Sequence, residues 1–161
     1  MISDALLQDL PKTDLHLHLD GSLRLGTLLE LAAERKVELP SRSPEGLREL
    51  VFKDEYADLG EYLHGFQYTC AVLQDEDSLE RAAYELAWDN IREGVFYIEV
   101  RFAPQLHMGR GMGLDEIFLA VDKGLRQAMR EHEASPDVVE EGKPPFRYGI
   151  ISCALRMFGP S

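Results

Sequence analysis

The sequence has 161 residues, with 29 acidic and 17 basic side chains and a formal net charge of −12 at pH 7. This length supports one domain with its own core. The acidic balance argues against a nucleic-acid partner, because phosphates are bound by clustered lysine and arginine. No apolar run approaches the ~18 residues of a membrane span and nothing resembles a signal peptide, so we expect no membrane partner and a cytoplasmic location.

The only two cysteines are Cys70 and Cys153, and neither belongs to a C-x-x-C pair. Their apolar surroundings predict reduced, buried thiols. The missing C-x-x-C motif also counts against the zinc deaminases that carry H-x-E and P-C-x-x-C signatures.

The first ten residues carry an apolar stripe at helical spacing, and Pro11 follows it. We expect a short helix here that covers one end of the fold. The members of the stripe are Ile2, Leu6, Leu7 and Leu10.

Residues 13–22 alternate polar side chains with leucine, which predicts a strand. The expected polar face consists of Asp14, His16, His18 and Asp20, and the expected covered face consists of Leu15, Leu17 and Leu19. Two neutral imidazoles at i and i+2 can reach one divalent cation, and zinc accepts mixed nitrogen and carboxylate ligands. The sequence therefore predicts a metal-binding face that includes His16 and His18.

This stretch resembles a known family signature. Residues 11–24, with the sequence PKTDLHLHLDGSLR, resemble the amino-terminal motif of the adenosine deaminase family, and residues 95–104, VFYIEVRFAP, resemble its second barrel strand. The resemblance implies a (β/α)8 barrel of the metal-dependent hydrolases. It also implies that His16 and His18 bind one zinc ion, and that His18 and Asp20 contact the substrate, Asp20 at a ribose hydroxyl.

Two helices are expected after the first strand. A T-x-x-E pattern at Thr27 and Glu30 predicts a capping box for a helix that ends near Lys36. Ser43 followed by Pro44 predicts the start of a second helix through Phe52.

Residues 59–73 carry an aromatic and aliphatic stripe at helical spacing, most of which we expect in the core. The family resemblance implies that the corresponding helix lies over the mouth of the barrel. It makes Tyr62, Leu63 and Phe66 candidate walls for a purine. We expect the neighbouring His64 on the surface.

The next elements are a helix that Asp77 and Glu80 cap and that ends at Gly94, and a strand over residues 95–102. We expect Glu99 and Arg101 to hold neighbouring strands through a buried ion pair or hydrogen bonds rather than to catalyse. We expect a loop over residues 104–113, in which His107 is more readily a solvated residue than one that approaches a site at the strand ends. A helix over residues 117–132, an acidic loop over residues 133–145 and a third strand over residues 147–155 complete the expected order.

Three strands are fewer than the eight that close a barrel, which needs at least about 200 residues. We therefore expect residues 1–161 to be the amino-terminal portion of a single barrel domain, whose remainder comes from the same polypeptide or a second chain. The resemblance implies zinc-dependent deamination of adenosine or 2′-deoxyadenosine in the complete enzyme. The catalytic glutamate is expected downstream, so this portion alone should be inactive.

Two alternatives remain open at this point. The same family chemistry would serve an adenine or aminofutalosine deaminase, although adenine deaminases tend to carry glutamate where Asp20 stands. A chain that is complete as it stands would instead be a non-catalytic module that binds metal or docks on another subunit.

Overall fold

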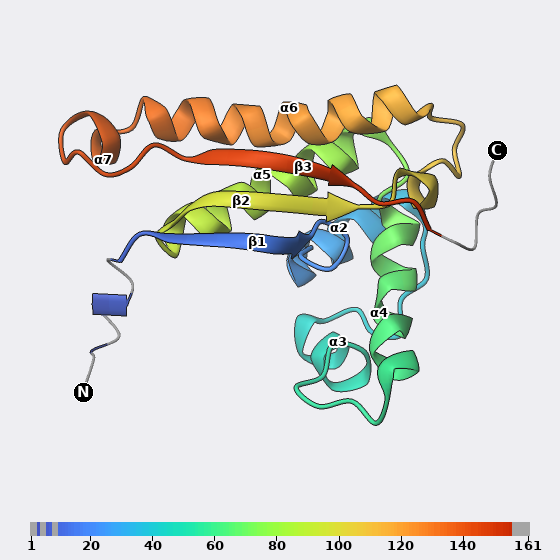
Figure 1. Ribbon diagram of the computed structural model, residues 1–161. Coiled ribbons are helices and arrows are strands. Elements are labelled where there is room, and N and C mark those ends of the chain that lie inside the picture. Colours follow the sequence, from blue (N-terminus) through green and yellow to red (C-terminus); the bar gives the residue numbers. More distant parts are fainter. Residues whose placement is uncertain (1–2, 4–5, 8–9, 156–161) are drawn as a thin grey trace.

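A three-stranded parallel sheet organises the chain. The computed structural model describes residues 3, 6–7 and 10–155. The strands are β1 (Lys12–His18), β2 (Val95–Phe102) and β3 (Arg147–Ser152), in the order β1-β2-β3. Figure 1 shows the three arrows pointing the same way, with helices α5 (Glu76–Arg92) and α6 (Leu114–Glu133) running alongside the sheet. The predicted α/β succession of strands and crossover helices is confirmed.

The remaining helices lie in the crossover connections. Between β1 and α5 come α2 (Leu25–Arg35), α3 (Pro44–Leu50) and α4 (Leu59–Val72). After β2 come the 3₁₀ turn η1 (Pro104–His107) and, beyond α6, the short helix α7 (Pro136–Val139). Figure 1 shows α4 standing across the carboxyl end of the strands, where the sites of parallel α/β proteins lie. No helix in the described ranges is long and apolar enough to cross a bilayer.

The core lies between β2 and the two long helices. Ile98, Val100 and Phe102 are buried on one face of β2, as the alternation predicts. They belong to the same apolar cluster as Leu86 of α5 and Val121 of α6. Burying such side chains contributes about 1.5–3 kcal/mol each, which makes this cluster the main source of stability.

Helices α5 and α6 approach each other closely at Gly124. A Cβ atom placed on Gly124 would lie 2.1 Å from the backbone oxygen of Glu80 and 2.9 Å from the backbone nitrogen of Tyr84. Only glycine permits this backbone contact, because neither neighbour is a side-chain end that can move away.

Strand β1 departs from the simple alternation that its sequence predicts. Asp14 pairs with Ile98 and Leu17 pairs with Val100, so β1 has one extra residue between these pairs. Such a bulge reverses the facing of side chains on either side of it. Asp14 therefore does not share the face of His18, which pairs with Arg101, and Leu15 is 58% exposed instead of covered. The predicted placement of Asp14 and Leu15 is wrong.

Side-chain caps begin three of the helices. Ser43 is the N-cap of α3 and accepts a hydrogen bond from the Gly46 N–H (3.1 Å), and Pro44 is the first residue of the helix. This confirms the predicted start of α3. Asp58 caps α4 through the Glu61 N–H (2.9 Å), and Asp75 caps α5 through the Ser78 N–H (2.9 Å). The predicted cap at Asp77 is thus displaced by two residues.

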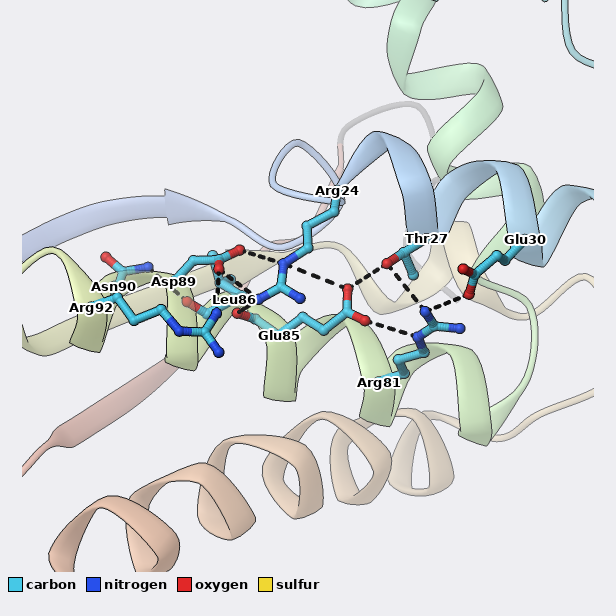
Figure 2. Close-up of polar contacts among 9 residues, drawn as sticks. All are labelled: Arg24, Thr27, Glu30, Arg81, Glu85, Leu86, Asp89, Asn90 and Arg92. Atoms are coloured by element: carbon cyan, nitrogen blue, oxygen red, sulfur yellow. Dashed lines mark hydrogen bonds and ion pairs between the residues drawn. The ribbon is translucent and has the colours of Figure 1, made fainter. Parts of the chain in front are cut away.

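The predicted capping box at Thr27 is wrong, because this residue lies inside α2, which begins at Leu25. Its hydroxyl donates to Glu85 of α5 over 2.6 Å instead. Figure 2 shows this bond within a network between the two helices, in which Arg24 reaches Asp89 and Arg81 reaches Glu85. The network fixes the helix that follows β1 to the helix that precedes β2.

Three further expectations have mixed outcomes. Leu6, Leu7 and Leu10 are 47–49% exposed, and Ile2 lies outside the described residues, as does much of the predicted first helix. The acidic loop contains the short helix α7, which was not predicted. The third strand ends at Ser152, three residues earlier than expected.

Candidate metal and substrate site

The two histidines of β1 lie side by side near the carboxyl end of the strand. The ring centroids of His16 and His18 are 5.3 Å apart, and both side chains are exposed. The extra residue in β1 falls between Asp14 and Leu17, and the ring distance shows that the two imidazoles nevertheless lie side by side. The structure thus brings together the two histidines that the sequence predicts as metal ligands.

Arg101 joins the histidine strand to its neighbours. Its Nη1 lies 2.9 Å from Nε2 of His16, and its Nη2 donates to Sγ of Cys153 over 3.4 Å. The guanidinium therefore links β1, β2 and the residue after β3. Glu99 accepts a hydrogen bond from the Tyr97 hydroxyl over 3.1 Å. The predicted role of holding neighbouring strands by hydrogen bonds is confirmed for Arg101, whereas the Glu99 bond stays within β2; both side chains are half-buried.

Asp20 lies directly beyond β1 and is 5% exposed. The Leu19 N–H donates to the Arg101 carbonyl over 3.1 Å, which extends the strand pairing up to this point. The thiol of Cys70 on α4 lies 3.7 Å from Asp20 Oδ2, within hydrogen-bond distance for sulfur, whereas Oδ1 has no partner among the described residues. Asp20 is thus a buried acceptor beside the histidines.

Phe66 of α4 closes one side of this site. Its ring meets His18 edge-on, with centroids 6.2 Å apart. Gly21 makes the approach possible, because a Cβ atom there would lie 3.2 Å from the Phe66 ring. Of the three aromatic and aliphatic candidates on α4, Phe66 is the one in ring contact with a predicted metal ligand.

The first half of the apolar stripe on α4 is exposed, whereas Leu73 at its end is fully buried, so the expectation that most of the stripe is core is wrong. Leu59 is 70% exposed, Tyr62 is 46% exposed and Leu63 is 49% exposed. Tyr62 meets Phe66 edge-on at 5.7 Å. The helix stands across the end of the sheet rather than against its face, so the first half of the stripe has no core to face (Figure 1). His64 is exposed as predicted.

His107 is fully buried, although the sequence predicts a solvated loop residue. Its Nδ1–H donates to the Leu73 carbonyl over 2.8 Å. Burial lowers the pKa of His107, and the Leu73 carbonyl and the Asp20 charge oppose that shift. The missed signal is local: Pro104 starts a 3₁₀ turn that carries the imidazole inward.

The histidine pair fits part of a zinc site. Zinc in proteins takes about four ligands, with histidine nitrogens at ~2.0–2.1 Å. Two adjacent imidazoles match half of that set. In the described ranges, no group of three or more histidine, cysteine or carboxylate side chains could hold a metal ion together. The other ligands of a zinc site on this face would have to come from outside the described chain.

Comparison with known proteins identifies relatives of the whole described region. The sequence profile of the adenosine deaminase family matches residues 11–155. A probable adenosine deaminase from Dictyostelium discoideum is 41% identical over 157 residues, which cover 97% of this chain and 19% of the relative.

Solved structures share the fold. The adenine deaminase from Arthrobacter aurescens superposes with a TM-score of 0.66 at 25% identity, covering 89% of this chain and 49% of that protein. An Arabidopsis protein named ADAL, solved in complex with IMP, superposes with a TM-score of 0.64 at 31% identity, covering 89% of this chain and 41% of that protein. The parallel sheet and its helices therefore correspond to part of the barrel of these proteins.

The match covers nearly all of this chain but only part of each relative. This chain spans about half of other adenosine deaminases that it matches, and 19% of the Dictyostelium relative. The matched profile nevertheless covers nearly all of the described residues, and it includes the histidine strand and β2. The chain belongs to the adenosine deaminase family.

Proposed function

We propose that this chain supplies the amino-terminal part of the active site of a zinc-dependent hydrolase that deaminates adenosine or 2′-deoxyadenosine. The products are inosine or 2′-deoxyinosine and ammonia, which is a purine salvage reaction. The observation that carries the proposal is the pair of exposed imidazoles, His16 and His18, at the carboxyl end of the first strand in a chain of this family.

His16 and His18 would hold the zinc ion through one ring nitrogen each. When bound, zinc supplies Lewis-acid chemistry that lowers the pKa of water into the neutral range. Arg101 contacts His16, and a guanidinium can only donate, so it occupies the ring lone pair that zinc would use and would have to move aside when the metal binds. In this proposal the histidine strand orients the metal, and the metal's other ligands and the catalytic glutamate lie outside this chain.

Asp20 and Phe66 would bind the nucleoside. Asp20 keeps an acceptor oxygen without a partner in the described chain, which suits the hydroxyl of a ribose. Phe66 offers an apolar ring beside His18, and Tyr62 extends that surface. Leu63, exposed on the same helix next to Tyr62, would complete this apolar wall for the purine.

The remainder of the barrel is the partner that this proposal requires. Strands β1 and β3 are the two edges of the described sheet, and each needs a further neighbour in a closed barrel. Residues 1–161 would then be one portion of a single barrel domain. An intact mass well above that of 161 residues would support a longer polypeptide, and a stable hetero-oligomer would support a second chain. A location in the cytoplasm stays a prediction.

A comparison of substrates tests the proposal. The purified active protein should convert adenosine and 2′-deoxyadenosine to the inosine nucleosides faster than it deaminates adenine or a modified nucleoside. Adenine is the second candidate, because an adenine deaminase shares the fold. Faster turnover of adenine than of adenosine would contradict the proposed substrate class and retain the deaminase chemistry. If a complete barrel turned over no aminopurine, the result would support the alternative of a non-catalytic module.

A further inference from the structure

The cluster of Asp20, Cys70 and His107 lies beyond the end of β1, and the proposed chemistry uses only its carboxyl group. Cys70 comes from α4 and contacts the buried carboxylate, and His107 of η1 lies close enough for the Asp20 charge to act on its imidazole. The thiol contacts Oδ2 of Asp20, and the carboxylate is 5% exposed. A buried carboxylate depends on such donors, because an unpaired charge away from water is costly.

The thiol can serve only as a hydrogen-bond donor in this position. Burial and the neighbouring Asp20 raise the pKa of Cys70 to about 12. The sulfur therefore keeps its proton throughout the neutral range and donates it to an oxygen that accepts. Oxidation and metal binding require the thiolate, so this environment disfavours both.

Hydrogen bonds fix the carboxyl end of α4, and with it the position of Cys70. Gln74 donates to the carbonyls of Cys70 and Leu106, both over 2.7 Å, and its Oε1 accepts from the Gly109 N–H over 2.8 Å. His107 adds its bond to the Leu73 carbonyl. These contacts join the end of α4 to the segment after β2, and they hold the thiol against Asp20.

We propose that Cys70 is a positioning residue for Asp20, whose thiol fixes the carboxyl group and thereby sets the affinity of the site for a substrate hydroxyl. The inference rests on the proposed function, which gives Asp20 its contact with the nucleoside. It adds Cys70, one turn beyond Phe66 on the same helix α4, to the determinants of specificity.

Two variants test this role in the complete, active protein. Cys70→Ala removes the donor, and Cys70→Ser restores one of similar size. We expect Cys70→Ala to raise the KM for adenosine about 3- to 10-fold, the effect of one hydrogen bond, with little change in kcat. Cys70→Ser should recover most of the loss. Ser135→Ala is the control, because it removes a hydroxyl donor to the His132 carbonyl beyond the far end of α6, and it should leave the KM unchanged.

Substrates that lack single hydroxyls separate positioning from general damage. The 2′-, 3′- and 5′-deoxy forms of adenosine each remove one possible partner of Asp20. The rise in KM caused by Cys70→Ala should disappear for the form that lacks the contacted hydroxyl. An equal rise for adenosine and all three deoxy forms would overturn the inference while the proposed function stands.

A spectroscopic measurement on the chain itself tests the contact without activity. In the Cys153→Ala background, Cys70 is the only thiol, and a donated hydrogen bond lowers its S–H stretching wavenumber. We expect the Raman band to move to higher wavenumber in Asp20→Ala. An unmoved band would overturn the inference. Absence of turnover in the unaltered complete protein, with a band that does move, would instead locate the failure in the proposed function.

Discussion

Nη1 of Arg101 lies 2.9 Å from Nε2 of His16, so the cation on β2 contacts the predicted metal ligand on β1. It also lies 3.1 Å from the other ring nitrogen, Nδ1. A zinc ion that binds His16 must share this space with a permanent positive charge. The metal and the guanidinium therefore compete for the same side of the imidazole.

This competition predicts the effect of Arg101→Met on metal binding. Removing the positive charge should raise the affinity of the protein for zinc several-fold, as measured by calorimetric titration. Arg147→Met is a control of the same type on β3, where the arginine pairs with Glu133, and it should leave the affinity unchanged. Unchanged or weaker zinc binding in Arg101→Met would contradict this competition.

The network between α2 and α5 predicts a large effect of Glu85→Ala on stability. Glu85 accepts from Thr27 over 2.6 Å and from Arg81 over 2.9 Å, and its side chain is 13% exposed. Its removal leaves both donors without this acceptor, so the free energy of unfolding should fall by about 1–3 kcal/mol in denaturant titrations. Glu34→Ala, at a pair whose carboxylate is 64% exposed, should cost less than about 1 kcal/mol. Equal losses would contradict the network's role.

The close contact at Gly124 predicts that Gly124→Ala is destabilising. The added Cβ meets the Glu80 carbonyl, so α5 and α6 must separate, at a cost of about 1–3 kcal/mol or more. Gly26→Ala is the matched control, because a Cβ there meets nothing within 4 Å and Gly26 lies inside α2. It should be neutral or stabilising by up to about 1 kcal/mol. The measurement is the thermal unfolding midpoint of both variants. An unchanged midpoint in Gly124→Ala would refute the close contact between α5 and α6.

The buried His107 predicts how stability depends on pH. Its pKa in the folded protein is lowered by burial, whereas in the unfolded chain it stays near 6.5. As the pH falls below about 6.5, the unfolded state takes up the proton first, so this contribution to stability is complete at higher pH and is lost on acidification. His107→Gln should therefore flatten the pH dependence of the unfolding free energy between pH 7 and pH 5. His64→Gln, at an exposed position, should not, and equal slopes in all three proteins would contradict the assignment.

Much of this arrangement is predictable from local sequence patterns. The alternation in β2, the cap at Ser43 and the i, i+2 histidines depend on neighbours in the chain, and the structure confirms each of them. The signature at residues 11–24 also led to the family that the comparisons identify.

The remaining features depend on contacts between distant segments. The extra residue in β1 arises from pairing with β2, which the alternation of β1 alone cannot reveal. Thr27 bonds to Glu85 across 58 residues, and this partner decides whether the hydroxyl caps a helix. Likewise, sequence periodicity assigns the apolar stripe of α4 to the core, while the position of α4 at the end of the sheet leaves Leu59, Tyr62 and Leu63 exposed.

The most direct test of the central claim is the zinc content of the purified protein, read together with its intact mass and its turnover of adenosine. The account predicts about one zinc ion per complete active site and conversion of adenosine to inosine. It also predicts loss of both in His16→Ala and His18→Ala, while His64→Ala retains both. A complete barrel that binds zinc and deaminates adenosine equally well without His16 and His18 would contradict the account.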